Sequence, residues 1–269
     1  MEAVRKLTVR DLLKLKQAGQ KIVTVTAYDA LFGRIADEAG MHLILVGDSA
    51  GNTVLGYKNT IPVTLEESLM LTAAVCRGVQ HAMVIGDMPF MSYQISETEA
   101  VRNAGRYLKE CGADGVKLEG GRRIQGLIAR LVDSGIPVFA HVGLQPQQVL
   151  KDGGYRIHGR DESEAEGIYK DALAVQEAGA FAVVLEGVSA ALAKRITSEL
   201  RIPTIGIGAG ACCDGQIQVI TDILGLGGDF VPRHAKQFGQ LGAAMKTALT
   251  DYCREVSEGT FPGEGQSSK

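Results

Sequence analysis

The sequence has little cysteine and no long apolar run. Its five cysteines form no Cys-x-x-Cys pair and no histidine-containing zinc spacing, and their odd number argues against a disulfide framework. The amino terminus alternates basic and apolar residues without the apolar core of a signal peptide, and no later segment approaches the ~18 uninterrupted apolar residues of a membrane span. We therefore expect a reduced, cytoplasmic protein that does not enter a membrane.

The sequence also lacks an excess of charge of either sign. It has 28 basic and 31 acidic residues, which gives a formal net charge of -3 at pH 7. A nucleic-acid surface or a polybasic membrane patch would need more lysine and arginine, so we expect a small-molecule partner and no nucleic acid. The length of 269 residues is near the upper limit for one hydrophobic core, which favours a single domain.

Apolar runs typical of buried strands alternate with helical patterns through most of the chain. This alternation indicates a parallel α/β sheet, because parallel strands are joined by crossover helices. Eight such units in this length favour closure into a single-domain (β/α)8 TIM barrel, while an open doubly wound sheet is an alternative that periodicity does not decide. The predicted strands are Ile22 to Ala27, Leu43 to Val46, Met83 to Asp87, Gly115 to Leu118, Pro137 to Ala140, Phe181 to Leu185, Pro203 to Gly206 and Ile217 to Ile220.

Polar residues at helix starts divide the chain further. Thr8 begins a short helix that we expect to cap the amino-terminal end of the barrel. A last helix, from Phe238 to Val256, completes a predicted domain of residues 1–258, and residues 259–269 form a polar, flexible tail. Capping boxes are predicted at Thr64 to Glu67, at Ser96 to Glu99, and at Ser163 and Glu166.

Two predicted strands end in a glycine followed by an aspartate. The first runs into Gly47, Asp48 and Ser49, and the second into Gly86 and Asp87. A single Gly-Asp-Ser sequence is typical of an ordinary turn. Its recurrence favours a functional site, because barrel enzymes build their sites at the carboxyl ends of several strands. Other strand ends carry Lys117, Glu119, His141, Glu186 and Asp222.

Lys117 and the neighbouring acids need a partner or a cation. Lys117 and Glu119 are two residues apart, so both point to the same face of their strand, here inward. Buried charges are costly unless they are paired or bound to a cation. Oxygen ligands from Asp48 and Asp87, with Glu119 as a further candidate, suit a hard cation such as magnesium. A salt-bridge network centred on Lys117 is the alternative.

Three other motifs carry weaker signals. Glu186 follows five apolar residues, so it is either a partly desolvated general base or an outward-facing acid at a strand end. A lone His141 at a strand end is more often a structural hydrogen-bonding group than a ligand. The glycines from Gly206 to Gly210 either bind a phosphate or allow close packing of the chain.

An ordered set of motifs resembles the ketopantoate hydroxymethyltransferase family from about Thr8 to about Val256. Gly-Asp-Ser alone is unspecific, but the order of the whole set is highly specific. The set consists of Val46-Gly47-Asp48-Ser49, Gly86-Asp87-Met88-Pro89-Phe90, Lys117-Leu118-Glu119, His141-Val142-Gly143-Leu144, Gly159-Arg160, Leu185-Glu186, Ile205-Gly206-Ile207-Gly208-Ala209-Gly210 and Cys213-Asp214-Gly215-Gln216.

The resemblance implies a magnesium-dependent (β/α)8 barrel that transfers a hydroxymethyl group from 5,10-methylenetetrahydrofolate to 3-methyl-2-oxobutanoate. The product would be 2-dehydropantoate, made through a magnesium-stabilised enolate for pantothenate and coenzyme A biosynthesis. Asp48 and Asp87 would hold Mg2+, with Glu119 as a further ligand or a water-mediated partner, and Glu186 would be the proton acceptor. A homo-oligomer, a decamer, is also implied. The residues that would contact the keto acid are Asp48, Ser49, Asp87 and Lys117.

Two other functions are considered. A related magnesium-dependent carbon-carbon lyase or mutase, of the phosphoenolpyruvate mutase and isocitrate lyase kind, would use the same enolate chemistry. Those enzymes carry a catalytic cysteine loop, whereas Cys76 and Cys111 fall within predicted helices. A non-catalytic barrel could bind an anion at Gly208 to Gly210, although anion binding needs no carboxylate base. The loop from Gly153 to Arg160 is the candidate to close over the site.

Overall fold

Eight parallel strands form a closed barrel in the computed structural model, which describes residues 5–227 and 231–267. Each strand pairs with the next in chain order, and β8 pairs back onto β1, so the predicted (β/α)8 barrel is confirmed and the open sheet is wrong. The strands are β1 (Ile22–Thr26), β2 (Leu43–Val46), β3 (Met83–Asp87), β4 (Gly115–Glu119), β5 (Val138–Gly143), β6 (Ala182–Glu186), β7 (Thr204–Ile207) and β8 (Gly215–Gln218).

The bounds of β8 correct one prediction. The strand begins at Gly215, two residues before the predicted start at Ile217. A glycine is usually a turn signal, but a Cβ atom at Gly215 would lie 2.3 Å from the backbone oxygen of Ile22. Gly215 therefore belongs to the strand because only a residue without a side chain allows β1 to approach this closely.

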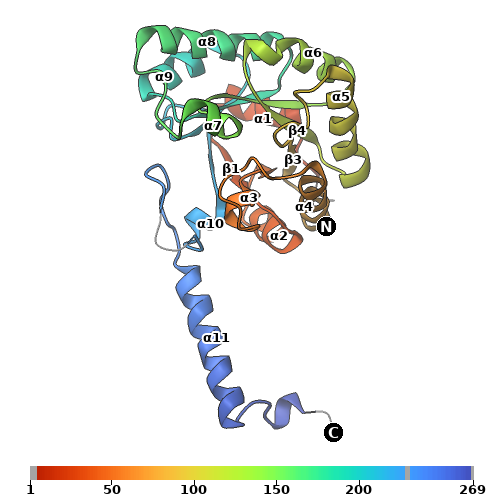
Figure 1. The fold of residues 1–269 in the computed structure, drawn as a ribbon, viewed down its shortest axis with the longest axis vertical. Coiled ribbons are helices and arrows are strands. Elements are labelled where there is room, and N and C mark those ends of the chain that lie inside the picture. The colour runs from red at the N-terminus through yellow and green to blue at the C-terminus, as the bar shows by residue number, and fades with distance from the viewer. Residues whose placement is uncertain (1–4, 228–230, 268–269) are drawn as a thin grey trace. The chain divides into compact units, whose positions relative to one another are not determined.

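Helices connect the strands and lie on the outside of the barrel (Figure 1). The last turn of α5 widens into a short π-helix, Tyr107–Cys111, which ends at Gly112 in the left-handed conformation. Two one-turn helices, α3 (Ala50–Thr53) and α7 (Val149–Asp152), belong to loops at the carboxyl ends of the strands. The longer helices of this region are α1 (Val9–Gln17), α2 (Ala30–Glu38), α4 (Leu65–Gly78), α5 (Glu97–Arg106), α6 (Gln125–Asp133), α8 (Glu162–Glu177) and α9 (Ala190–Glu199).

The capping box predicted at α4 is present, and the one at α5 is present in part. The hydroxyl of Thr64 accepts a hydrogen bond from the backbone N–H of Glu67 (3.2 Å), and the Thr64 N–H donates to the Glu67 carboxylate (2.8 Å). At α5 the Ser96 hydroxyl accepts from the Glu99 N–H (3.2 Å), which is the first half of the pattern. Both interactions satisfy backbone donors that have no partner within the helix.

The capping box predicted at α8 is wrong. Asp161 is the N-cap, and its carboxylate accepts hydrogen bonds from the backbone N–H groups of Ser163 (3.0 Å) and Glu164 (3.1 Å). Ser163 is already inside the first helical turn, and Glu166 instead pairs with Arg195 on α9 (3.0 Å). The prediction failed because an aspartate two residues upstream offers a carboxylate that caps the same N–H groups.

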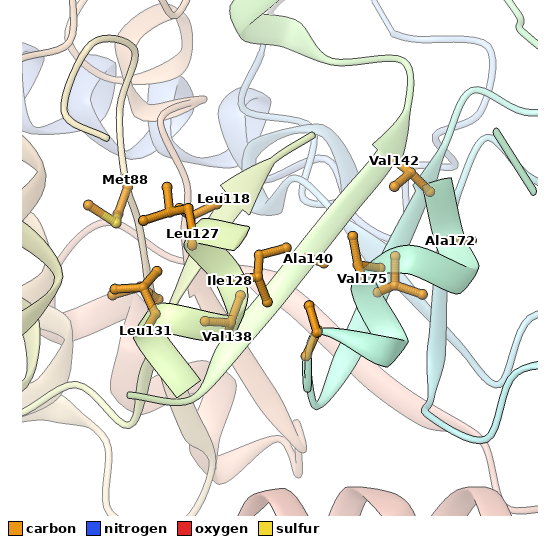
Figure 2. Packing of buried hydrophobic residues seen from close by; sticks show 14 of the residues in the cluster. Met88, Leu118, Leu127, Ile128, Leu131, Val138, Ala140, Val142, Ala172 and Val175 are labelled. Atoms are coloured by element: carbon orange, nitrogen blue, oxygen red, sulfur yellow. The ribbon is translucent and has the colours of Figure 1, made fainter. Parts of the chain in front are cut away.

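Alternating side chains along the strands divide the apolar residues between two layers. On β5, Val138, Ala140 and Val142 point outward and pack against α6 and α8 (Figure 2). Phe139, between them, belongs to a separate cluster inside the barrel. Because successive side chains of a strand point to opposite faces, His141 must also point inward.

The amino-terminal end of the barrel is filled by apolar side chains and covered by α1. Leu12 of α1 is 1% exposed and packs with the interior cluster, which includes Ile22, Leu43, Met83 and Phe139. The helix is fixed there by an ion pair between Lys16 and Asp214, with Nζ and Oδ2 2.6 Å apart. The predicted capping helix is therefore confirmed.

The chain divides into a barrel unit, Met1–Val219, and a C-terminal unit, Ile220–Lys269. The C-terminal unit contains α10 (Ile220–Ile223) and α11 (Leu241–Glu258). The prediction of one domain that extends to residue 258 stays a prediction. Within the described ranges, none of the helices has the length and apolar character needed to cross a membrane.

Candidate active site

The strand alternation brings the predicted acids and the lysine into the barrel interior at its carboxyl end. Met83 and Ile85 on β3 point inward, and so does Asp87. On β4, Val116 and Leu118 belong to the outer layer, which directs Lys117 and Glu119 inward. The same parity applies to Glu186, because Ala182 and Val184 of β6 belong to the interior cluster while Val183 and Leu185 belong to the outer one.

Lys117 is the centre of a buried ion-pair network. Its ammonium nitrogen lies 2.8 and 3.0 Å from the two carboxylate oxygens of Asp87, which is its neighbour across β3 and β4. It also lies 3.3 Å from Oε1 of Glu119. The three side chains are 5%, 2% and 1% exposed. The salt-bridge network that was considered as the alternative to a metal site is thus present, while the metal site stays a prediction.

Asp48 and Ser49 follow β2 and reach the same region. The backbone N–H of Asp48 donates to Oδ2 of Asp87 (3.1 Å), which fixes the two Gly-Asp motifs against each other. The hydroxyl of Ser49 lies 2.8 Å from the hydroxyl of Tyr28, a residue just after β1. Five of the six predicted site residues therefore lie on β3 and β4 or directly follow β2, namely Asp48, Ser49, Asp87, Lys117 and Glu119.

The cluster holds more acidic than basic groups, and this raises acid pKa values. Burial, followed by the charge of Asp87, raises the pKa of Asp48 well above its usual range. Burial raises the pKa of Glu119 to about 7, although Lys117 acts in the opposite direction. Burial also acts to lower the pKa of Lys117, but the charges of Asp87, Glu119 and Asp48 outweigh it and raise that pKa well above its usual range.

The donor set fits a hard divalent cation. Asp48, Asp87 and Glu119 offer oxygen ligands, and a cation would offset the excess negative charge that raises the acid pKa values. Within residues 5–227 and 231–267, no group of three or more His, Cys, Asp and Glu side chains is arranged to hold a metal ion by itself. A cation would therefore take one or two protein carboxylates, and oxygens of substrate and water would complete its coordination. Mg2+ is commonly bound in this way.

Glu186 lies at the carboxyl end of β6, across the barrel mouth from β2. Its side chain is 21% exposed, so it is accessible to a ligand. Burial of the carboxyl group, together with the charges of Asp48 and Asp87, raises the pKa of Glu186 to about 8. A carboxylate with a raised pKa is a stronger base than an ordinary glutamate. The inward orientation also excludes the alternative of an outward-facing acid.

Gly143 and His141 shape the surroundings of Glu186. Gly143 on β5 adopts φ +95°, and a Cβ atom there would lie 2.4 Å from the Glu186 backbone oxygen, so only glycine allows β5 to turn here. The Nε2 atom of His141 lies 3.4 Å from Oε2 of Glu186, but neither ring nitrogen makes an aligned hydrogen bond within the described part of the chain. Burial, together with the charge of Lys117, holds the pKa of His141 well below its usual range, so its ring is neutral.

Sequence reasoning missed Gln147 and Tyr93. Gln147 is 3% exposed, and its amide donates to Oδ2 of Asp48 (2.9 Å), while its backbone N–H donates to Oε2 of Glu119 (3.1 Å). The Tyr93 hydroxyl donates to Oε1 of Gln147 (2.9 Å). Neither residue belongs to a strand, and the run Gln145-Pro146-Gln147-Gln148 has no pattern that predicts which glutamine is buried.

Other predicted features lie elsewhere or remain predictions. Asp222 belongs to α10 of the C-terminal unit, so it does not directly follow β8. A Cβ atom at Gly210 would lie 2.9 Å from that of Ala190, which supports close packing as the reason for this glycine. The loop from Gly153 to Arg160 is held at its end by the His158 N–H, which donates to the Gly187 oxygen (2.7 Å) directly after Glu186. Its closure over the site stays a prediction.

Solved structures with the same fold include two enzymes that act on phosphorus compounds. Phosphoenolpyruvate phosphomutase from Streptomyces platensis subsp. rosaceus is 15% identical with a TM-score of 0.62, and the match covers 98% of this chain and 92% of that chain. Phosphonopyruvate hydrolase in complex with oxalate and Mg++ is 13% identical with a TM-score of 0.60, over 98% of this chain and 92% of that chain. At these identities the likeness shows the fold alone.

Sequence relatives give a more specific result. A 3-methyl-2-oxobutanoate hydroxymethyltransferase from Chloroflexus aurantiacus is 54% identical over 264 residues, which cover 98% of this chain and 93% of the relative. The model of the family described as ketopantoate hydroxymethyltransferase matches residues 6–264. The resemblance seen in the motifs is confirmed, and the non-catalytic alternative is set aside. This chain belongs to the ketopantoate hydroxymethyltransferase family and is a hydroxymethyltransferase enzyme.

Proposed function

We propose that this enzyme transfers a one-carbon unit from 5,10-methylenetetrahydrofolate to 3-methyl-2-oxobutanoate and forms 2-dehydropantoate, with Mg2+ as its cofactor. The observation that carries the proposal is the position of Glu186. Its raised pKa and partial exposure suit a base, and it lies at the mouth of the same barrel that holds Lys117 and three further acids. The relative from Chloroflexus aurantiacus, named for a keto acid, supports this substrate.

The residues divide the chemistry between them. When bound by Asp48 and Asp87, Mg2+ would supply a Lewis acid that makes the hydrogen beside the ketone group more acidic. Glu186 takes that proton from C3 of the keto acid. The ammonium of Lys117, fixed by Asp87 and Glu119, stabilises the negative oxygen of the resulting enolate. Ser49 would hydrogen-bond the keto acid, which Asp48 and Asp87 would also contact.

The group transfer balances with one water. C3 of the enolate forms a bond to the methylene carbon, and both carbon-nitrogen bonds of the methylene bridge break in the course of the reaction. Water supplies the hydroxyl group of the product. The proton from C3 and the second hydrogen of the water go to the two nitrogens of tetrahydrofolate. No oxidant or reductant is needed.

Proton NMR of 3-methyl-2-oxobutanoate in deuterated buffer tests the proposal in two steps. With enzyme and Mg2+ alone, we expect the C3 hydrogen to exchange for deuterium. After addition of 5,10-methylenetetrahydrofolate, we expect signals of 2-dehydropantoate. Exchange without conversion would refute the folate donor but keep the enolate chemistry. Absence of both signals from folded, metal-loaded enzyme would refute the whole proposal.

A related lyase or mutase reaction is distinguished by the same measurement on other substrates. A lyase leaves smaller products, a mutase leaves an isomer of its substrate, and neither needs folate. The solved structures of that kind share only the fold with this chain, at 13% and 15% identity. Turnover of phosphonopyruvate or phosphoenolpyruvate, with no turnover of 3-methyl-2-oxobutanoate, would favour this alternative.

We also propose that the enzyme is a cytoplasmic homo-oligomer. All five cysteines are free, as expected in a reducing compartment. In α11, apolar residues recur every three or four positions along one face, and the small C-terminal unit by itself buries none of them.

Light scattering tests the oligomer. It should show an assembly that Leu249→Asp weakens and that Thr247→Asp, on the opposite face, leaves intact. A wild-type monomer would refute the oligomer. The residues of the stripe are Leu241, Met245, Leu249, Tyr252 and Val256.

A further inference from the structure

A cavity of about 320 Å³ lies beside the carboxylate cluster, and the proposed reaction does not yet use it. It opens between the segments that follow β3, β4 and β5, and Ile61 from the segment after β2 also lines it. Phe90 and Tyr93 come from the first segment, Arg123 and Ile124 from the second, and Gln147 with the residues of α7 from the third. Its volume is at the lower end of the ~300–1,000 Å³ typical of ligand sites.

The floor of the cavity is connected to the proposed keto acid site. Glu119 and Gln147 both line it, and both are 3% exposed. The Gln147 amide also donates to Asp48 (2.9 Å) and to the Met88 backbone oxygen (2.9 Å). A molecule on this floor is therefore separated from the carboxylates by no more than one side chain, which is the position that a co-substrate needs.

The walls combine apolar surface with amide groups. Leu150 is 75% exposed and Phe90 is 38% exposed, and both line the cavity, so they offer apolar surface to a ligand in it. The Gln94 amide donates to Oε1 of Gln147 (3.2 Å), so amide groups lie at the inner end. A flat heteroaromatic ring with amide-like edges would cover the apolar surface and hydrogen-bond to these groups.

Two cations line the mouth of the cavity. Arg123 and Lys151 are exposed, and in the described part of the chain neither forms an ion pair with a carboxylate. Their hydrogen bonds are made to neutral amides, from Arg123 to Gln145 (3.2 Å) and from Lys151 to Gln148 (3.1 Å). These cations remain available for the carboxylates of a ligand.

We propose that this cavity binds the tetrahydrofolate co-substrate, with the reduced pterin ring on the Gln147 and Glu119 floor. The benzoyl ring then contacts Leu150 and Phe90, and the glutamyl carboxylates pair with Arg123 and Lys151. An apolar cavity with an acidic floor and a basic mouth matches a ligand that has a polar ring at one end and carboxylates at the other. The inference rests on the proposed function and names the binding site of its donor.

Charge reversal at Arg123 and Lys151 tests their proposed contact with the glutamyl carboxylates of the folate. Calorimetry would measure the binding of 5-formyltetrahydrofolate, as its monoglutamate and its triglutamate, to the full-length enzyme with Mg2+ and keto acid. For the variant carrying Arg123→Glu and Lys151→Glu, we expect binding of the triglutamate to weaken about tenfold or more, since two exposed attractions become repulsions. The advantage of the triglutamate over the monoglutamate should disappear. The matched control is Lys194→Glu, which reverses the charge of an exposed lysine on α9 and should change the affinity for neither ligand.

Truncation of the Leu150 side chain separately tests the proposed contact with the benzoyl ring. For Leu150→Ala we expect both ligands to bind about threefold more weakly, because the lost apolar contact lies next to the rings and not the tail. Leu150 is 75% exposed, so we expect this variant to fold normally even if the charge-reversal variant does not.

The deuterium exchange of the keto acid separates the two proposals. It needs no folate, so it reports the carboxylate cluster and the fold of each variant. An unchanged triglutamate advantage in the charge-reversal variant, with normal exchange and transfer, would overturn the cavity assignment and leave the proposed function intact. A wild-type enzyme that exchanges the keto acid but binds no tetrahydrofolate would overturn both.

Discussion

The two ends of the same barrel differ sharply in what their strands contribute. At the amino-terminal end the interior holds Leu12, Leu43 and Phe139, all nearly without exposure, and α1 covers it. At the carboxyl end, one or two inward positions further along the strands, the interior holds Asp87, Lys117 and Glu119. Apolar burial stabilises the first end, whereas burial of charge at the second end raises acid pKa values. The comparison teaches that one scaffold supports stability and reactivity in separate layers.

The largest effect is expected at the carboxyl end, from Glu186→Gln. Turnover should fall by about 10²- to 10⁴-fold because a neutral amide cannot accept the C3 proton. Keto acid binding, measured by calorimetry, should stay within a few fold, since the amide has nearly the shape of the carboxyl group. Turnover near the wild-type rate would show that another group is the base.

The next effect concerns the other end of the barrel. Phe139→Ala removes a fully buried ring that stacks on Phe181, with ring centroids 5.7 Å apart. We expect the free energy of unfolding to fall by about 3–5 kcal/mol in a urea titration. The activity per folded molecule should change little at a temperature where the variant is folded. A large loss of activity without a loss of stability would break the proposed separation of the two layers.

Removal of Mg2+ should lower stability by less than Phe139→Ala does, and the effect should depend on the proposed metal ligands. A ligand that binds only the folded state at a hundred times its dissociation constant stabilises it by about 2.7 kcal/mol. We expect Mg2+ to raise the melting temperature of the wild type and a chelator to reverse this. Asp48→Asn should abolish the response, whereas Asp152→Asn, an exposed acid in α7, should retain it. An identical response in all three proteins would refute the proposed site.

The smallest effect is the change in the free energy of unfolding of the metal-free enzyme for each unit of pH. The folded-state pKa values of Glu119 and Glu186 are raised to about 7 and about 8, so the folded protein binds protons more tightly than the unfolded chain does. Their contribution to stability is full below the ordinary glutamate pKa and is lost as pH rises through about 7 and 8. The slope approaches ~1.4 kcal/mol per pH unit and per group, less what solvent around Glu186 screens. Glu186→Gln should flatten the upper part of the curve, and an unchanged curve would contradict the raised pKa.

The positions of the reactive groups were predictable where they follow strands. Asp48, Asp87, Lys117, Glu119 and Glu186 all lie at or just after the ends of apolar runs, and the two-residue period of a strand fixes which of them point inward. The prediction was less accurate where a competing interaction was available. Asp161 replaced the predicted Ser163 as a helix cap, and β8 begins at Gly215, two residues before its predicted start at Ile217.

The sequence by itself determined the alternation of strands and helices, the inward parity of the acids and the lysine, and the family resemblance. These features depend on local periodicity or on the order of short motifs, which a linear chain displays directly. Only the tertiary structure decided that eight strands close into a barrel, that Gln147 connects Asp48 to Glu119, and that Arg123 and Lys151 line one cavity. Residues of separate loops come together only when the barrel closes, and no local pattern records which of their side chains will meet.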